Sequence, residues 1–250
     1  MLRLYLLYVV VLTAALRLRG FDARALARPS APATPPRAGA LRVLIIGATG
    51  GTGRQLVTQA LERGHEVTAV ARNPAALDIT HPRLKVLRGD VLDSASLDPA
   101  VRGQDAVLSA LGHKKFFPPN RILSDGTRNV LRAMEAHGVS RFICETGLGI
   151  GDTTGRMGLY YTMFVIPVIL PAYFLDKTRQ EQLIAKSRLN WTIVRPGALT
   201  NGELRGKYRH GSRIGSFVTT MKISRADVAH FMLNQLTDDT YLRAAPGVCW

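Results

Sequence analysis

The stretch "LIIGATGGTGRQL" (residues 44–56) places four glycines and two threonines between an apolar run and the start of an amphipathic segment. Gly47, Gly50 and Gly53 follow the spacing G-x-x-G-x-x-G. The free N–H groups and the dipole at a helix N-terminus favour negative charge, and a pyrophosphate approaches closely only where Cβ atoms are absent. The stretch therefore predicts a phosphate-binding turn between a strand and a helix.

Apolar runs alternate with amphipathic helical segments on both sides of this turn. Continuous apolar strands between helices are typical of a parallel sheet that is covered on both faces. We therefore expect an α/β protein with a single Rossmann-type, doubly wound parallel sheet and helices on both faces. The expected strands are residues 42–48, 65–72, 84–91, 105–112, 141–147 and 190–199, and the expected helices are residues 53–64, 94–103, 125–138, 175–187 and 224–236.

The end of the second expected strand indicates which cofactor the turn would bind. An acidic residue there binds the ribose 2′-hydroxyl of NAD, whereas an arginine accommodates the 2′-phosphate of NADP. This chain has Arg72 in "VARNP" and no carboxylate before Asp78. The sequence therefore predicts NADP, with NADPH preferred over NADH, while a solvated surface role for Arg72 stays open.

Two further strand ends offer cofactor contacts. Asp90 and Val91 follow the third strand, where a carboxylate can accept a hydrogen bond from the adenine amine and a valine can pack beside the ring. Leu111 and Gly112 in "SALGHK" follow the fourth strand, where backbone can line the nicotinamide side. Successive strand ends share one edge of a parallel sheet, which is where a dinucleotide lies.

With these motifs in place, the chain resembles the atypical, NAD(P)H-binding branch of the short-chain dehydrogenase/reductase superfamily. The likeness extends to the biliverdin-IXβ reductase/flavin reductase group and to NmrA-like proteins. It rests on "GATGGTG", "GDVLD", "GQDAVLSALG", "GTRNVLRAMEAHGVSRFI", "WTIVRPGAL" and "ISRADVAHFML". The resemblance implies a cofactor site formed by Gly47, Thr49, Gly50, Gly51, Thr52, Gly53, Arg72, Asp90, Val91, Leu111 and Gly112.

The resemblance also suggests catalytic candidates. Much of the superfamily uses a Tyr-x-x-x-Lys pair, in which the lysine binds the nicotinamide ribose and the tyrosine moves a proton. Tyr173 and Lys177 have this spacing, which puts them on one helical face. Thr146 stands nearest to the superfamily's substrate-orienting serine. Gly147 and Gly197 stand where the flavin/biliverdin group has a serine and a histidine, which weakens the case for a biliverdin-like substrate.

These residues lead to two functional hypotheses. The first is an NADPH-dependent oxidoreductase that transfers hydride to a small flat electron acceptor, namely a flavin, a quinone or a carbonyl compound. Its substrate pocket is expected along residues 147–174 and 197–213, where Arg205 and Arg209 would suit an anionic group. The alternative is a non-catalytic NADP-binding sensor or assembly factor of the NmrA-like kind. No cluster of His, Cys or carboxylates has metal-ligand spacing, so we expect no metal.

The bulk properties bound the partners and the compartment. The formal net charge is +15, but the arginines are scattered, so we expect small anionic molecules and not nucleic acid. Two cysteines cannot form a disulfide framework, which favours a reducing, cytoplasmic location. The oligomeric state is left open.

The N-terminal region differs from the rest of the chain. Residues 4–16 are apolar, but thirteen helical residues span only about 20 Å of a hydrocarbon core about 30 Å thick. A weak membrane anchor on the cytoplasmic face, an upstream extension and a signal peptide all remain open. We expect an apolar segment with a Pro/Ala-rich linker at 1–40, the Rossmann domain at 41–244 and a tail at 245–250.

Overall fold

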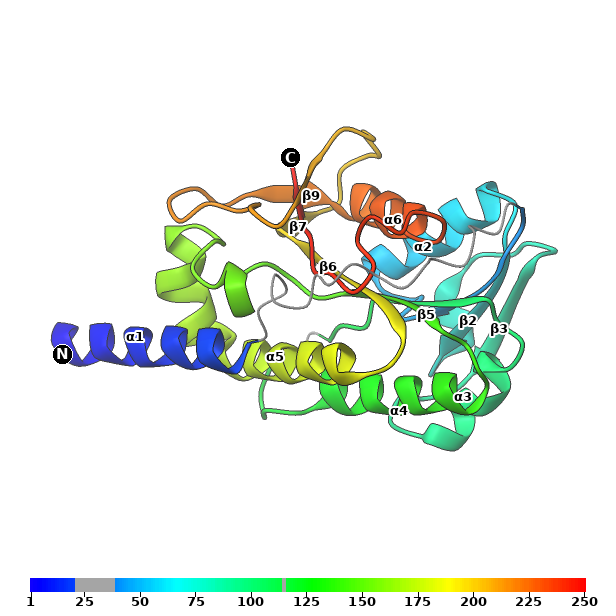
Figure 1. Cartoon of the computed structure of the whole chain (residues 1–250), viewed down its shortest axis with the longest axis horizontal. Helices are drawn as coiled ribbons and strands as arrows, with labels where there is room; N and C mark the ends of the chain where they lie inside the picture. The colour runs from blue at the N-terminus through cyan, green and yellow to red at the C-terminus, as the bar shows by residue number, and fades with distance from the viewer. Residues whose placement is uncertain (21–38, 114–115) are drawn as a thin grey trace.

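The computed structural model describes residues 1–20, 39–113 and 116–250 of the chain. Most of the predicted linker lies outside these residues. Within them, the central sheet has the strand order β3-β2-β1-β4-β5-β6-β10-β8, and neighbours pair in parallel except β10 and β8. Figure 1 shows the arrangement of the whole chain. In that order the strands are Leu84–Arg88, Glu66–Ala71, Arg42–Ile46, Ala106–Ser109, Arg141–Glu145, Asn190–Pro196, Gly247–Cys249 and Arg209–Gly211.

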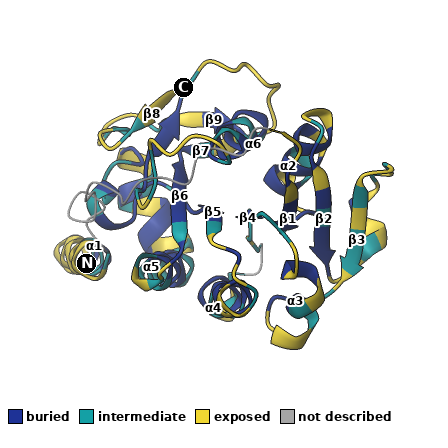
Figure 2. Cartoon of the chain, turned by 45° about the vertical axis from the view of Figure 1, so that its right-hand side comes forward, coloured by how far each residue is buried: buried dark blue, intermediate teal, exposed yellow. Residues whose placement is uncertain are grey.

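Helices cover both faces of this sheet (Figure 2). Helices α2 (Gly51–Glu62) and α6 (Arg225–Asn234) lie on one face, and α3 (Ser94–Val101), α4 (Ile122–Ala136) and α5 (Pro171–Lys186) lie on the other. The predicted doubly wound α/β fold is therefore confirmed.

Side chains of β1 show how the two layers form. Val43 and Ile45 belong to the apolar core under α2 and α6, whereas Leu44 and Ile46 belong to the core under α3 and α4. All four are fully buried, because successive side chains of a strand point to opposite faces of the sheet. The uninterrupted apolar run of this strand follows from that two-sided burial.

The C-terminal part departs from the expectation in two places. The strand expected at 190–199 is divided, because β7 (Ala198–Thr200) leaves the central sheet and pairs with β9 (Lys222–Ser224). The division falls at Gly197, where a Cβ would lie 2.5 Å from the carbonyl oxygen of Met221. Residues 247–249 are not part of a tail, since they form β10 inside the sheet.

The N-terminal segment forms one helix, α1 (Leu2–Arg19), which packs on the short helix η2 (Gly151–Thr153) and the π-helix η3 (Tyr161–Ile169). Val9 and Leu16 are its buried residues. Among the described residues, no helix is both long enough and apolar enough to cross a bilayer. A further short helix, η1 (Pro74–Leu77), follows β2.

Candidate functional site

The glycine turn joins β1 to α2 at the point where the sheet order reverses, with β2 on one side of β1 and β4 on the other. Such a switch point is where open α/β sheets bind ligands. Gly47 has a φ of +78°, and a Cβ there would lie 2.5 Å from the carbonyl oxygen of Ala110. At Gly53 a Cβ would lie 2.0 Å from the carbonyl oxygen of Gly47. These two glycines therefore let the turn close and the helix pack against the strand.

Gly50 has a different role. It is the N-cap of α2, and a Cβ there would meet only the carbonyl oxygen of Gly47, at 3.2 Å. A glycine N-cap has no side chain with which to cap its own helix, so the first N–H groups can serve an anion. The turn thus combines glycines required for packing with one that leaves the helix terminus open to a ligand.

A cavity of about 640 Å³ opens at this turn and runs along the ends of β1 to β5. All predicted cofactor residues except Gly53 line it, and Tyr173 and Lys177 line it too. The residues predicted at four strand ends, and the pair predicted on helix α5, therefore line a single cavity. The predicted lining residues are Gly47, Thr49, Gly50, Gly51, Thr52, Arg72, Asp90, Val91, Leu111 and Gly112.

Local contacts hold Asp90 and Val91 in place beside the cavity. Asp90 Oδ1 accepts a hydrogen bond from the backbone N–H of Leu92 at 3.0 Å. The carbonyl of Val91 accepts one from Asn129 Nδ2 at 3.0 Å, and a Cβ at Gly126 would lie 2.8 Å from the Val91 side chain. The loop after β3 is therefore fixed against α4, in a position to pack against a planar group.

Tyr173 and Lys177 project from the first two turns of α5, which begins at Pro171. The Lys177 ammonium donates a hydrogen bond to the backbone carbonyl of Thr146 and lies 5.2 Å from the centre of the Tyr173 ring. A Cβ at Gly112 would lie 3.8 Å from the Tyr173 hydroxyl, so this hydroxyl is close to the end of β4. The pair therefore stands at the end of the cavity where the resemblance expects the nicotinamide.

Thr146 does not meet its expectation. Its side chain is buried and its hydroxyl donates to Glu181 Oε1 at 2.7 Å, and the residue takes no part in lining the cavity. Only its carbonyl faces the site, where it accepts the hydrogen bond from Lys177. The prediction that the Thr146 hydroxyl orients a substrate is therefore not supported by this geometry. Thr146 instead positions Lys177 through its backbone.

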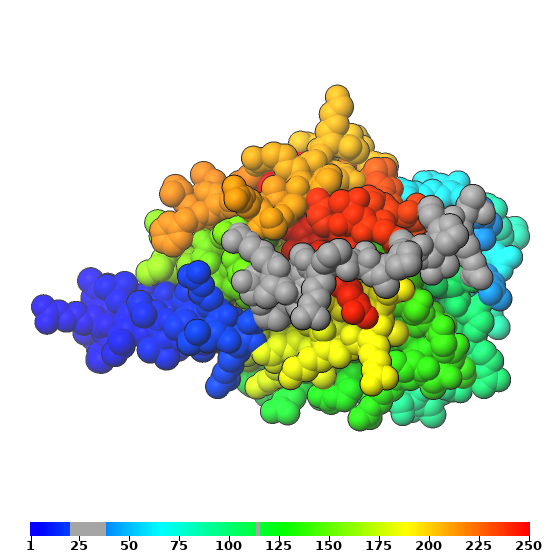
Figure 3. All heavy atoms as spheres, viewed as in Figure 1, coloured from blue at the N-terminus to red at the C-terminus, as the bar shows by residue number. Residues whose placement is uncertain are grey.

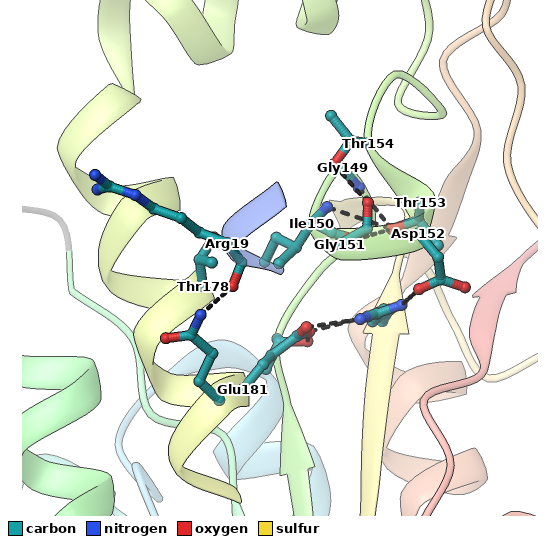
Figure 4. A network of polar contacts seen from close by, with 12 residues as sticks. Arg19, Gly149, Ile150, Gly151, Asp152, Thr153, Thr154, Thr178 and Glu181 are labelled. Atoms are coloured by element: carbon teal, nitrogen blue, oxygen red, sulfur yellow. Dashed lines mark hydrogen bonds and ion pairs between the residues drawn. The ribbon is translucent and has the colours of Figure 1, made fainter. Parts of the chain in front are cut away.

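The carboxylate that binds the Thr146 hydroxyl belongs to a buried ionic network. Glu181 on α5 receives two hydrogen bonds from Arg195 on β6, at 2.9 and 2.7 Å. Figure 4 shows Glu181 and Asp152 on the two sides of the guanidinium group that they share. Arg195 also reaches Asp152 Oδ1 at 2.5 Å, in the loop after β5. Burial lowers the pKa of Arg195, but the charges and hydrogen bonds of Glu181 and Asp152 outweigh it and raise the pKa overall. The network ties α5, β6 and the helix η2, which contains Asp152, together.

Sequence reasoning missed Glu145, the last residue of β5. It lines the cavity, is buried, and accepts a hydrogen bond from the Thr52 hydroxyl at 3.2 Å. Burial raises the pKa of its carboxyl, against the opposing effects of Lys177, Thr52 and Arg225. The sequence did contain a signal for Glu145, because "ICETG" places a carboxylate at the end of a strand, on the same edge of the sheet as Asp90.

Arg225 and His113 were missed as well. Arg225, the first residue of α6, lines the cavity, and a Cβ at Gly51 would lie 2.4 Å from its side chain. It is thus placed to meet an anion at the N-terminus of α2. His113 lines the cavity and packs edge-on against Tyr173, with ring centres 5.1 Å apart. Arg225 lies in the motif "ISRADVAHFML", but the motif did not indicate that its side chain would reach the glycine turn.

The predicted substrate-binding arginines are engaged elsewhere. Arg205 lies over the ring of Trp250 at 3.8 Å, and Arg209 donates to the Trp250 carbonyl at 2.9 Å. Neither lines the cavity, to which residues 197–213 contribute Leu199 and residues 147–174 contribute Tyr173. These arginines therefore fasten the C-terminus. In the described part of the chain, no group of three or more His, Cys, Asp or Glu could hold a metal ion.

The chain is similar in sequence and structure to known proteins. A family model described as NAD(P)H-binding matches residues 47–239. An uncharacterised chloroplast protein of Arabidopsis thaliana is 31% identical over 173 residues, which cover 64% of this chain and 60% of that protein. The photosystem II assembly factor Ycf39 of Synechocystis is 26% identical over 171 residues, which cover 67% of this chain and 48% of that protein. The chain thus spans less than two thirds of the length of these relatives.

Solved structures share the fold. A Rossmann-fold NAD(P)-binding family protein from Shigella flexneri is 28% identical, with a TM-score of 0.64 over 84% of this chain and 93% of that one. A short-chain dehydrogenase/reductase from Veillonella parvula, solved in complex with NADP, has a TM-score of 0.70 at 20% identity over 85% and 95% of the two chains. The chain therefore belongs to the NAD(P)H-binding family.

Proposed function

We propose that the chain is an NADPH-dependent oxidoreductase that reduces a small flat acceptor, namely a flavin, a quinone or a carbonyl compound. The observation that carries the proposal is that Tyr173 and Lys177 line the same cavity as the glycine turn. A purely structural Tyr-x-x-x-Lys spacing would not require both side chains to open into the cofactor cavity. A cytoplasmic location is part of the same proposal.

The cavity residues fit a dinucleotide phosphate. The open N-terminus of α2 and the Arg225 side chain would hold the pyrophosphate, and Arg72, exposed at the end of β2, would bind the 2′-phosphate. Asp90 and Val91 would flank the adenine at the end of β3. This arrangement supports NADPH over NADH, because Arg72 stands where a NAD-binding chain carries a carboxylate.

The proposed reaction needs only two side chains of the chain, Tyr173 and Lys177. The bound nicotinamide supplies the hydride, and Tyr173 gives a proton to the acceptor oxygen when the acceptor is a carbonyl. Lys177, held by the Thr146 carbonyl, binds the nicotinamide ribose and keeps a positive charge next to the Tyr173 ring. A flavin or a quinone needs less from Tyr173, since hydride transfer to these acceptors depends mainly on orientation.

The test is NADPH oxidation by the purified full chain with a panel of flavins, quinones and aldehydes. Cofactor affinity is measured separately by fluorescence titration. Tyr173→Phe keeps the ring contact with His113 and should lower aldehyde turnover while NADPH still binds. Tyr161→Phe, in η3 and outside the cavity, is the matched control and should leave turnover unchanged. Absence of turnover with every acceptor would overturn the enzymatic proposal.

A second candidate is a non-catalytic NADP-binding sensor or assembly factor. Two observations favour it. The Thr146 hydroxyl donates its hydrogen bond to Glu181 and not to a substrate, and Gly147 has no side chain that could orient a substrate. Ycf39, named as an assembly factor, is among the similar proteins. Tight NADPH binding by a chain without turnover would support this second function.

A further inference from the structure

Helix α1 is apolar on the side that faces away from the protein as well as on the side that packs against it. Its inner residues are Tyr5, Val9, Leu12 and Leu16, spaced by four, three and four positions, as expected for one helical face. On the rest of the helix, Leu2, Leu4, Leu7, Val10 and Val11 are between 57% and 71% exposed. A water-exposed helix normally carries polar residues there. The outer side of α1 is therefore suited to an apolar environment.

Hydrogen bonds and apolar contacts hold α1 in one orientation on the body of the protein. The Tyr8 hydroxyl donates to the carbonyl of Pro167 at 2.7 Å, and the Tyr5 hydroxyl donates to the carbonyl of Met163. At the other end of the helix, Leu16 packs into an apolar cluster with Leu148, Ile166 and Phe174. These contacts make α1 part of a fixed surface.

The π-helix η3, which accepts both tyrosine hydrogen bonds, continues the apolar surface. Most of the exposed large apolar side chains of the described residues lie in residues 1–18 or 159–169. Figure 3 shows α1 projecting from the body beside this segment. We name this region the α1–η3 surface; its exposed apolar members are Leu2, Leu4, Leu6, Leu7, Tyr8, Val10, Val11, Leu159, Tyr160, Phe164, Val168 and Ile169.

The charged residues within the two segments that form the α1–η3 surface are basic. Residues 2–19 and 153–175 contain no Asp or Glu, whereas Arg3, Arg17 and Arg19 are exposed at the two ends of α1. A large exposed apolar patch marks an interaction site, and basic residues beside it favour an anionic lipid surface. Each basic residue near such a surface adds to the electrostatic attraction.

We propose that the α1–η3 surface binds flat against an anionic lipid bilayer. Its apolar side chains enter the boundary between headgroups and acyl chains, Tyr160 lies at the headgroup level, and the arginines meet lipid phosphates. The binding is peripheral, consistent with the finding that no described helix could cross a bilayer. A second copy of the chain fits less well, because a two-fold contact through this surface would bring its arginines near one another.

The test is flotation of the full chain with vesicles of phosphatidylcholine, with and without phosphatidylglycerol. The wild type should float with the anionic vesicles, less so as salt is raised, and weakly with neutral ones. Leu7→Glu and Phe164→Glu should each lower partitioning at least roughly tenfold, the size expected for removing one buried apolar side chain. Leu204→Glu is the control, because Leu204 is 48% exposed and Phe164 is 46% exposed, but Leu204 lies outside the surface.

A measurement on the unmodified chain guards against misfolded variants. Anionic vesicles should slow hydrogen exchange of residues 2–11 and 159–169 and leave the glycine turn unchanged. Failure of the wild type to float, or an equal loss for Leu204→Glu, would overturn the proposal. It would also be overturned by a dimer that Leu7→Glu dissociates in the absence of any vesicle binding, which would assign the surface to a second copy. None of these readouts depends on NADPH turnover.

Discussion

Glu181 and Arg195 form an ion pair in which both side chains are fully buried, with Glu181 Oε2 2.7 Å from Arg195 Nη2. Removing Arg195 leaves the Glu181 charge buried without compensation, whereas removing Glu181 leaves Arg195 with Asp152 as its remaining partner. We therefore expect Arg195→Met to lower the free energy of unfolding by about 3–5 kcal/mol and Glu181→Gln to lower it by less.

Urea unfolding of the two single variants and of the double variant Glu181→Gln/Arg195→Met measures this coupling. The double variant should lose clearly less than the sum of the single losses, since it leaves neither partner of the pair alone. Single losses below about 1 kcal/mol, the range of an exposed pair, would contradict the buried network as a source of stability.

The two kinds of glycine in the turn should respond differently to alanine. Gly53→Ala would place a Cβ 2.0 Å from the Gly47 carbonyl oxygen, so it should cost more than about 3 kcal/mol of stability. Gly50→Ala should keep the melting temperature but weaken NADPH binding roughly tenfold, because its Cβ enters the space next to the helix N-terminus. Thermal melts and cofactor titrations separate the two effects. Equal melting temperatures for both variants would contradict the packing role of Gly53.

The local pattern of the sequence was sufficient for strands β1 to β6 of the central sheet and for most of the residues that line the cavity. Apolar strands, glycine spacing and strand-end residues such as Arg72 and Asp90 are properties of short segments, and parallel strand ends necessarily share an edge. The direction of the Thr146 side chain could not be predicted from a short segment, because it depends on Glu181, which is 35 positions away. A hydroxyl with a buried carboxylate nearby points toward that carboxylate and not toward a substrate.

The remaining differences from prediction also involve contacts between residues that are far apart in the sequence. Arg225 reaches the turn only because β7 and β9 pair outside the central sheet. Arg205 and Arg209 were predicted to face a substrate, but the C-terminal Trp250 binds both. The docking of α1 also depends on η3, a segment about 160 residues later in the chain, with which its tyrosines form hydrogen bonds.

Arg72 should determine the preference between the two nicotinamide cofactors. Arg72→Ala removes the side chain proposed to bind the 2′-phosphate, and a charge-assisted hydrogen bond contributes about 1.5–3 kcal/mol. We expect NADPH affinity to fall by roughly ten- to a hundredfold and NADH affinity to stay unchanged. Arg132→Ala, exposed on α4 and outside the cavity, removes the same charge and is the control. An equal loss for NADH, or an unchanged NADPH affinity, would contradict the assignment of Arg72.

Glu145 should make both stability and cofactor binding depend on pH. Burial raises the pKa of its carboxyl above the ordinary value of 4.5, so the folded chain holds this proton more tightly than the unfolded chain does. Its contribution to stability is therefore complete below pH 4.5 and is lost as the pH rises through the raised pKa. Glu145→Gln, which cannot ionise, should abolish this part of the pH dependence in urea unfolding measured at successive pH values.

The same carboxylate would repel a bound pyrophosphate, since Glu145 accepts a hydrogen bond from Thr52 at the phosphate turn. Cofactor binding should therefore favour the protonated form of Glu145 and weaken as the pH rises. NADH is the better probe, because it lacks a 2′-phosphate that titrates in the same range. Its affinity should fall with rising pH for the wild type and fall less steeply for Glu145→Gln. Parallel pH profiles for the two proteins would show that Lys177 and Arg225 fully compensate the Glu145 charge, against this prediction.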